Sequence, residues 1–562
     1  MSRNCRRFLM AFALALCGQE VVAETKLPRD ASKQCIVSDL GKWFQSGRVS
    51  VHGFVNPPDT VAFPNGVACD FYTWAERMFL WLTSPPPAEY GPGSNVFDTP
   101  VFFEVSPAER GSQRTLSVNS PDRIKQVSVG VSQVGSHGAA VALDDAGRMR
   151  RLVRLERDAT SGNPLIRDRD GKPSEIAGTK IGRNRQPIFL GASGKPIDLE
   201  RSADGIPLLR DSSGNTIEFA RSLKTSTLRG QRLFLDRSGN VIETARGLAS
   251  DEMVLMARDN KLVYYTIAVN DVFAYFLTGV KQHALSDGNF PITRDDLKAV
   301  ETFANKQFPD KNVLAVEIKF AWVEAAGLPN ASGYVTTWAN LPEYKTSDDR
   351  HWIRTGCCRK ALLALVGMNI GFSVNPQKQM LWAAFEHINN TPNPRYRYLN
   401  KKGKKWKEAD KGRNWLFSSG GADAPDQNTL RMYSDGKDIH AVPNKTIGPT
   451  NVLRLKPWGL DPTQDRLNTD VISINNSVRV ALSNGDVRKN YIMIGATWRS
   501  HDMGGAALGT NLLANSTMET FVQGSNCLDC HKGSSPDSML GTKNGGGLSH
   551  IFGVTGPLPS PK

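Results

Sequence analysis

Two cysteines and a histidine stand close together near the end of the chain, in the stretch SNCLDCHKG (525–533). Cys527 and Cys530 are separated by two residues, and His531 follows directly. Two thiols at this spacing can form thioethers with the two vinyl groups of one porphyrin, while the adjacent imidazole binds its iron from the same side. The pattern predicts one covalently bound haem c, with Cys527 and Cys530 as attachment residues and His531 as the proximal axial ligand.

A redox-active dithiol and a zinc site are the chemical alternatives at this position. Random placement of the eight cysteines and nine histidines of the chain gives about 0.002 matches to C-x-x-C-H. A redox C-x-x-C opens a helix after a strand in a thioredoxin-like βαβ unit, and the flanking sequence predicts no such unit. Zinc needs further ligands, but the chain has no second C-x-x-C and no H-x-x-x-H. The sequence therefore favours haem attachment.

The sixth iron ligand has several candidates. His550 lies beyond a glycine-rich stretch, 541–547, that could fold it back over the haem. Met539 is the alternative, because thioether ligation raises the reduction potential. Other candidates are His387, His501, Met503 and an open site. We also predict a helix that carries Glu386 beside His387, which is either a distal acid/base pair for peroxide chemistry or an ordinary pair on a core helix.

The tail resembles the c-type cytochromes. LGTNLLANSTMETFVQGSNCLDCHKG (508–533) is similar to a cytochrome c N-terminal helix that runs into the attachment loop. The resemblance covers roughly residues 506–562 and implies a helical haem segment; too few residues follow His531 for a complete small cytochrome, so the larger body is expected to complete the haem pocket. MLWAAFEHINNTPNP (380–394) is similar to a segment of large exported bacterial cytochrome c family proteins, which implies no established activity.

The N-terminus has the pattern of a secretory signal peptide, residues 1–23. A start with three arginines precedes ten apolar residues, Phe8–Cys17, and a small-residue cleavage site. That run is too short to span a bilayer, and no later stretch approaches ~18 apolar residues. We expect a periplasmic protein without a stable membrane span. Its net charge falls from +14 to +12 on cleavage, because three arginines and Glu20 are lost, and this favours an acidic redox partner rather than nucleic acid.

Four further cysteines belong to the mature body. Cys35 and Cys69 are a plausible disulfide that closes the N-terminal region, since an oxidising compartment permits such bonds. Cys357 and Cys358 are adjacent. They could form a strained vicinal disulfide, remain as buried thiols, or pair with Cys35 and Cys69; spacing alone leaves these alternatives open.

We predict an α+β fold, in which a large mixed body carries an inserted β-hairpin module and the C-terminal cytochrome c-like helical haem segment. The expected division is an N-terminal α+β region at 24–134, the hairpin module at 135–250, the main body at 251–505 and the haem segment at 506–562. Four similar segments define the module, each with an apolar strand, a DG- or SG-type turn and a second strand. They span 164–176, 187–199, 207–219 and 232–244.

Individual elements of the body can be predicted from local patterns. Helices are expected at 69–87, where prolines stop an aromatic stripe, and at 293–308, where Thr293 and Asp296 form a capping box. The stretch 313–325 alternates apolar and polar residues and predicts a half-buried strand, and 491–498 predicts a central one. The basic run 401–415 is either a solvated loop or a surface that steers an acidic partner.

These observations favour an exported monohaem c-type cytochrome that transfers single electrons. The alternatives are a haem-dependent oxidoreductase or peroxidase-like enzyme, and a ligand-binding or sensor protein with a structural haem. No dinucleotide-binding glycine motif after a strand, P-loop or nucleophile elbow points to another chemistry.

Overall fold

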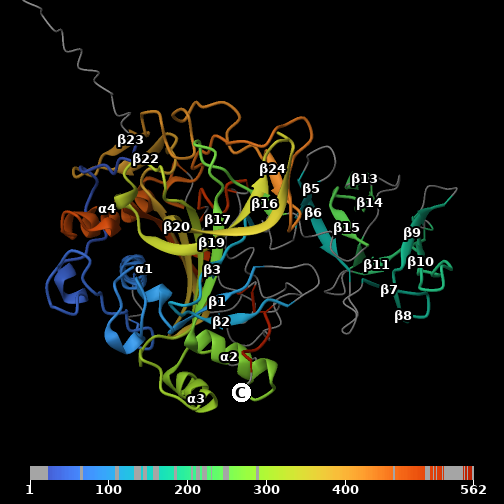
Figure 1. Ribbon diagram of the computed structural model, residues 1–562, viewed down its shortest axis with the longest axis horizontal. Coiled ribbons are helices and arrows are strands. Elements are labelled where there is room, and N and C mark those ends of the chain that lie inside the picture. Colours follow the sequence, from blue (N-terminus) through green and yellow to red (C-terminus); the bar gives the residue numbers. More distant parts are fainter. Residues whose placement is uncertain are drawn as a thin grey trace, which may run out of the picture.

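The computed structural model describes residues 23–559 with internal gaps (Figure 1). The residues left out of this range are 64–66, 108–112, 132–140, 144–148, 156–163, 183–186, 204, 206, 211–215, 218–224, 229–230, 245–251, 287–289, 460–461, 500–506, 511, 514, 522, 524–548, 550 and 553–554.

A 14-stranded, largely antiparallel sheet forms the body. Its main path runs β2-β1-β17-β18-β20-β25-β24-β16-β4, with β19, β21, β26, β27 and β3 branching from it. The long strand β20 is central, because it pairs with β18, β19, β21 and β25. The bounds are β1 Phe102–Val105, β2 Leu116–Val118, β3 Lys125–Gln126, β4 Gly130–Val131, β16 Glu252–Val254, β17 Tyr264–Asn270, β18 Val316–Glu324, β19 Thr336–Lys345, β20 His351–Val374, β21 Gln377–His387, β24 Met432–Ser434, β25 Ile439–Ala441, β26 Tyr491–Arg499 and β27 Ala507–Gly509.

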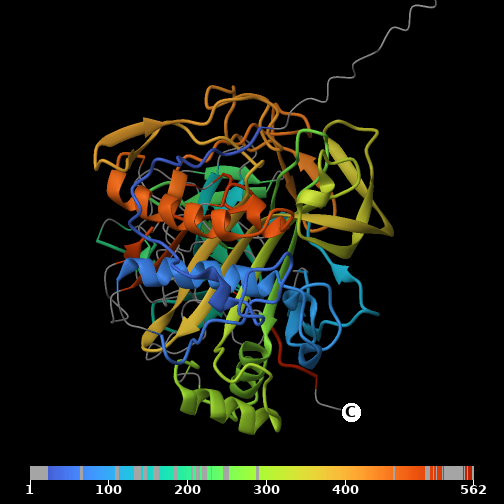
Figure 2. The same cartoon turned by 90° about the vertical axis from the view of Figure 1, so that its left-hand side faces the viewer.

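Within the described ranges there are only four α-helices, so the predicted α+β class is wrong for a molecule that is mostly sheet. They are α1 Ala68–Leu82, α2 Asp271–Lys281, α3 Arg294–Ala304 and α4 Asp465–Ala481. Figure 2 shows α1 and α4 side by side across one face of the sheet, with α2 and α3 grouped at one end of the body. The helices therefore cover a sheet that supplies most of the core, rather than forming a layer of comparable size.

Helix α1 confirms the helix predicted at 69–87, although it ends at Leu82, and its aromatic stripe is core. Phe71 stacks on Trp498 of β26 at 4.0 Å between ring centroids, and Phe79 stacks on Phe385 of β21 at 4.5 Å. Asp70 sits in the first turn and accepts a hydrogen bond from the backbone N–H of Val67. The spacing of the aromatics places them on one side of the helix, where they bury large apolar areas against the sheet.

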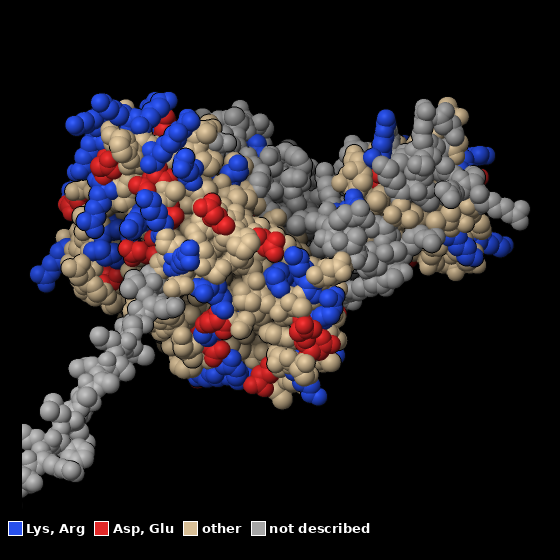
Figure 3. Space-filling model, turned by 90° about the horizontal axis from the view of Figure 1, so that it is seen from above, with Lys and Arg blue, Asp and Glu red and all other residues tan. Residues whose placement is uncertain are grey.

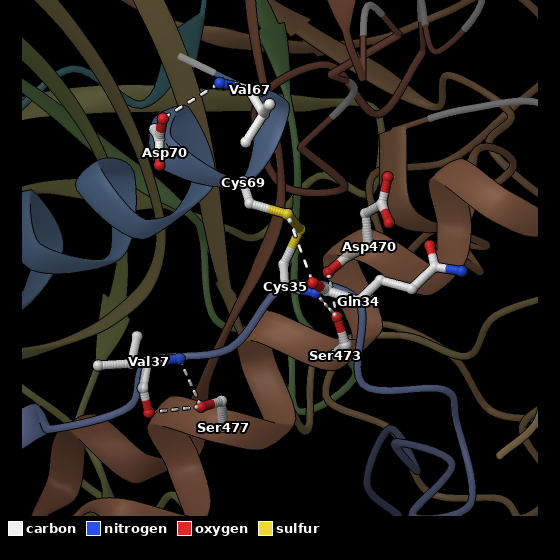
Figure 4. Close-up of a disulfide and its surroundings, with 9 residues drawn as sticks. All are labelled: Gln34, Cys35, Val37, Val67, Cys69, Asp70, Asp470, Ser473 and Ser477. Carbon is white, nitrogen blue, oxygen red and sulfur yellow. Dashed lines mark hydrogen bonds between the residues drawn. A yellow bond between two sulfur atoms is a disulfide. The ribbon is translucent and has the colours of Figure 1, made fainter. Parts of the chain in front are cut away.

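The predicted Cys35–Cys69 disulfide is present (Figure 4). It joins the N-terminal segment to the start of α1, with 5.2 Å between the two Cα atoms. The backbone N–H of Cys35 also donates to Ser473 of α4, and Val37 N–H donates to Ser477 one turn later. The cross-link thus holds the N-terminal segment against both covering helices.

Two further local predictions agree with the structure. Thr293 caps α3, and its hydroxyl and the Asp296 carboxylate form the expected reciprocal capping box. The predicted strand 491–498 is β26, which is buried along nearly its whole length and pairs with β21 and β27. Both predictions rest on residues close together in the sequence, a capping box in the first case and a continuous apolar run in the second.

All four predicted segments fold back on themselves. Three of them pair named strands, β7 with β8, β11 with β12, and β14 with β15. In the fourth, Leu190 bridges antiparallel to Pro196, and its first strand β10 also pairs with the preceding β9. Gly171, Gly194 and Gly239 adopt the positive φ that the turns require. The apolar residues of these segments share a small core of their own, which lies to the right of the body in Figure 1. The bounds in this region are β5 Val141–Leu143, β6 Met149–Arg154, β7 Leu165–Arg167, β8 Pro173–Glu175, β9 Gly178–Ile181, β10 Pro187–Leu190, β11 Leu209–Arg210, β12 Thr216–Ile217, β13 Thr225–Leu228, β14 Gln231–Leu235 and β15 Val241–Glu243.

The helix predicted around Glu386 and His387 is wrong, because this stretch is strand β21. Residues 380–387 are apolar or buried at every position. A strand covered on both faces and a core helix both show this pattern. Pairing with β20 on one edge and β26 on the other decides between the two. Consecutive side chains of a strand point to opposite faces, so Glu386 and His387 do not form a pair.

Candidate functional site

The predicted haem-attachment residues lie outside the described residues. This applies to Cys527, Cys530 and His531, and equally to Met539, His550, His501 and Met503. The structure does describe the chain on both sides of the attachment motif, up to Gln523 and again from Ser549. The candidate site is therefore built from these two flanks and from the part of the body that they contact.

The preceding flank is not the helix that the cytochrome resemblance implies. Residues 507–509 form β27, and no helix occurs among the described residues between 510 and 523. The Asn515 side chain forms a turn here instead, because its Oδ1 accepts from the backbone N–H and from the hydroxyl of Thr517. Such local bonds compete with helical hydrogen bonding, which explains why Asn, Ser and Thr favour turns here.

A buried ion pair anchors this flank to the sheet. Arg454 Nη2 donates to Glu386 Oε2 at 2.7 Å, and both side chains are almost fully buried. Ser516 donates to the same carboxylate from its backbone N–H at 2.6 Å and from its hydroxyl at 2.5 Å. Asn393 Oδ1 accepts from Arg454 Nη1 at 2.6 Å. The carboxylate of β21 is thus shared between the body and the tail, only eleven residues before Cys527.

Further hydrogen bonds extend this anchor toward the attachment motif. Gln523 accepts from the backbone N–H of Leu455 and donates to the carbonyl of Leu453. Tyr265 of β17 donates its hydroxyl hydrogen to the carbonyl of Thr517 at 2.7 Å. Met518 is fully buried in the core on this face of the sheet. The chain is therefore held in place to within four residues of Cys527.

The following flank returns to the same body. Phe552 is buried against Phe273 and Phe276 of α2, at centroid distances of 6.0 and 5.9 Å. The backbone N–H of Leu558 donates to Thr278 Oγ1, also in α2. Ser549 lies beside the Glu317 carboxyl at the start of β18. Gln523 before the motif and Ser549 after it are therefore both in contact with the body.

Both flanks meet the polar face of β18. Glu317 and Lys319 project from this face, and the Lys319 ammonium interacts with Glu317 and with Glu519 of the tail. We refer to Glu317, Lys319, Asn369, Glu386 and Arg454 as the tail-anchoring face. The prediction that β18 is half-buried is wrong, since both Glu317 and its apolar neighbours are covered.

Burial of the tail-anchoring face perturbs two carboxyl groups. Desolvation raises the pKa of Glu519 from 4.5 to about 7, against the lowering effects of Lys319 and of hydrogen bonds from Asn369 and Asn515. Desolvation likewise raises the pKa of Glu317 to about 7, although Ser549 and Lys319 lower it. The protonated form of each group is favoured in the folded state because charge is costly in a buried site.

We expect the free energy of unfolding to fall as the pH rises through this range. The unfolded chain releases these protons near pH 4.5, whereas the folded protein holds them to about pH 7. The stabilisation is therefore complete below the unfolded pKa and is lost as pH rises through the folded pKa, at about 1–3 kcal/mol per group. Urea unfolding from about pH 5 to pH 8 measures this slope, and Glu519→Gln should reduce it by the contribution of one group.

Glu200→Gln is the matched control, because Glu200 is exposed in the hairpin region. It should leave the slope unchanged. A Glu519→Gln variant that keeps the full wild-type slope would contradict the assignment of this titration to the tail-anchoring face.

His387 is a core residue and is excluded as the sixth ligand by its contacts. Its ring stacks on Tyr334 at 3.8 Å, Nε2 lies 3.3 Å from the carbonyl oxygen of Gly333, and Nδ1 accepts from the backbone N–H of Asn389. Burial lowers its pKa to about 3, which keeps the imidazole neutral. Both ring nitrogens are engaged, so neither binds iron nor transfers a proton to a ligand.

Cys357 and Cys358 are free and exposed on β20. All three alternatives considered from the sequence are wrong. The two thiols are exposed rather than buried, and no vicinal disulfide joins them. Bridges to Cys35 and Cys69 are excluded because these two cysteines are bonded to each other. Sequence reasoning missed Arg454, whose partner Glu386 is 68 residues away. The signal in the sequence that could have found it is an arginine in the otherwise apolar stretch VLRL (452–455).

No protein-family model, curated protein or solved structure matches this chain. Across the part of the chain that the structure describes, no three His, Cys, Asp or Glu side chains are grouped to hold a metal ion. In the same residues, no helix has both the length and the apolarity to cross a bilayer.

The donor set of the tail nevertheless fits haem. Cys527 and Cys530 supply the two thiols and His531 supplies the imidazole, in the order that covalent attachment needs. The residue types present are therefore compatible with covalent haem attachment.

Proposed function

We propose that this protein is an exported monohaem c-type electron-transfer protein. The observation that carries the proposal is the C-x-x-C-H motif at 527–531 behind a signal-peptide pattern, since c-type haem is attached outside the cytoplasm. Haem supplies a one-electron couple at its iron, whose potential depends on axial ligation, hydrogen bonding and burial. An acidic redox partner fits the net charge of the mature chain, +12 after loss of residues 1–23.

The residues of the body have a positioning role in this proposal. The Glu386–Arg454 pair and Gln523 hold the chain before Cys527, and the packing of Phe552 on α2 holds the chain after the motif. Gln523 lies only four residues before Cys527, so chain length limits the distance of this cysteine from the body. Met518 and its apolar neighbours exclude water from this face of the sheet.

A haem-dependent enzyme is the second candidate, and the coordination of the iron distinguishes the two. An electron-transfer protein keeps two firm axial ligands, whereas peroxide or small-oxidant chemistry needs an available iron position. The exclusion of His387 weakens the enzyme candidate, because it removes the distal acid/base pair that the sequence suggested.

Absorption spectra of protein matured in a periplasm test the proposal. We expect a covalent haem, stained on a denaturing gel, whose reduced spectrum does not change on addition of carbon monoxide. His550→Ala should then convert the spectrum to one that responds to carbon monoxide, while Met539→Ala should not. A wild-type protein that binds carbon monoxide would contradict simple electron transfer, and its activity toward peroxide would be measured next.

A further inference from the structure

The hairpin formed by β22 Tyr396–Leu399 and β23 Lys405–Glu408 carries an unusual density of positive charge. Between residues 395 and 413 there are nine Lys and Arg and two Asp and Glu, a net charge of +7, half of the +14 of the whole chain. All residues from Lys401 to Lys407 are exposed. This hairpin lies at the upper left of the body in Figure 1, and Figure 3 shows Lys and Arg crowded at that edge.

The hairpin is rigidly mounted. Tyr396 and Tyr398 belong to β22 and their side chains are buried. The Tyr398 hydroxyl donates to the Asp30 carboxylate. Helix α4 holds it from below, because Thr469 accepts from the backbone of Leu399. The turn itself is fixed by Asn400, whose side chain accepts from the backbone N–H groups of residues 402 and 404. A fixed turn presents its side chains in one direction.

The charges at the tip are not neutralised by the body. Lys405 pairs with Asp465 at 2.9 Å. The structure records, among its described residues, no ion pair for Lys401, Lys402, Lys404 or Lys407. The single large hydrophobic side chain exposed on the hairpin is Trp406, which is 54% exposed. A tryptophan between lysines combines an aromatic ring that favours the membrane–water interface with cations that favour phosphate groups.

We propose that the β22–β23 hairpin is a docking site for an anionic lipid surface. The geometry favours a bilayer over a protein, because a specific protein interface covers about 800 Å² on each partner and has an apolar core. This hairpin offers a narrow tip with one aromatic ring. A membrane surface accommodates such a tip, since Trp406 can enter the headgroup region while the lysine stems lie along it and their ammonium groups bind phosphate oxygens.

Vesicle sedimentation with the full mature holoprotein tests this proposal without any readout from the haem. We expect binding to phosphatidylcholine vesicles that contain phosphatidylglycerol, loss of binding in high salt, and little binding to phosphatidylcholine alone. Replacing Lys401, Lys402, Lys404 and Lys407 together by Gln should weaken binding at least about tenfold. Trp406→Ala should weaken it at unchanged charge.

The matched control removes the same charge elsewhere. Lys172, Lys180, Lys195 and Lys437 are exposed and lie outside the hairpin, so their joint replacement by Gln should leave most of the binding intact. Equal losses in the two quadruple variants would overturn the proposal, because binding would then follow net charge. Binding of the hairpin to polyglutamate without binding to anionic vesicles would also overturn it, in favour of an acidic protein partner.

Discussion

The Cys527→Ala/Cys530→Ala variant is expected to lose covalent haem completely while the body still folds and is exported. Both thioethers depend on these thiols, so no haem should remain on a denaturing gel. The body is held by its own sheet and by the Cys35–Cys69 disulfide, neither of which needs the attachment motif. Haem staining and circular dichroism of the purified periplasmic fraction measure the two effects separately.

The second cysteine pair provides the control for this experiment. Cys357 and Cys358 are exposed and free, so Cys357→Ala/Cys358→Ala removes two thiols without touching the motif. This variant should stain for haem as strongly as the wild type. Haem that stays covalently attached in the 527/530 variant would refute the assignment of the motif.

Replacement of Arg454 by Met is expected to cost about 3–5 kcal/mol of folding free energy. The change leaves the Glu386 carboxylate buried without its cation, and Ser516 alone donates to it from the tail. An uncompensated buried charge is far more costly than the net value of the pair. The unfolding midpoint in urea gives the global effect, and limited proteolysis shows whether the tail is released from the tail-anchoring face.

Two further variants separate charge burial from general damage. Arg454→Met/Glu386→Gln removes both charges and should recover a large part of the loss. Arg359→Met breaks the more exposed pair with Glu324 and should cost less than about 1 kcal/mol. Equal losses in Arg454→Met and Arg359→Met would show that burial of the Glu386 pair has no special energetic role.

Sequence reasoning was most successful for features that depend on nearby residues. Helix α3 begins where its capping box predicts, and the positive-φ glycines mark turns in the hairpin region. The aromatic stripe of α1 correctly predicted a buried helix face. These features can be predicted because their hydrogen bonds and packing directions are set within a few residues.

The errors concern residues whose environment is supplied from far along the chain. The helix predicted around Glu386 and His387 is a strand, because the buried run at 380–387 pairs with β20 and β26. The alternation in β18 predicted a solvent-exposed polar face, but the tail returns about 200 residues later to cover it. The cytochrome-like helix before the motif is absent from the described residues, where the side chain of Asn515 bonds to Thr517 and forms a turn.

The sequence by itself determined the chemistry that this chain can offer, because thiol and imidazole spacing is a covalent property of adjacent residues. It also determined the charge concentrated at 395–413. Only the tertiary structure decided which groups support the motif, since Glu386, Arg454 and Ser516 come from separate parts of the chain and meet only when the sheet has formed. It also turned the basic run into an outward-facing hairpin with a fixed turn, because buried tyrosines and α4 hold its base.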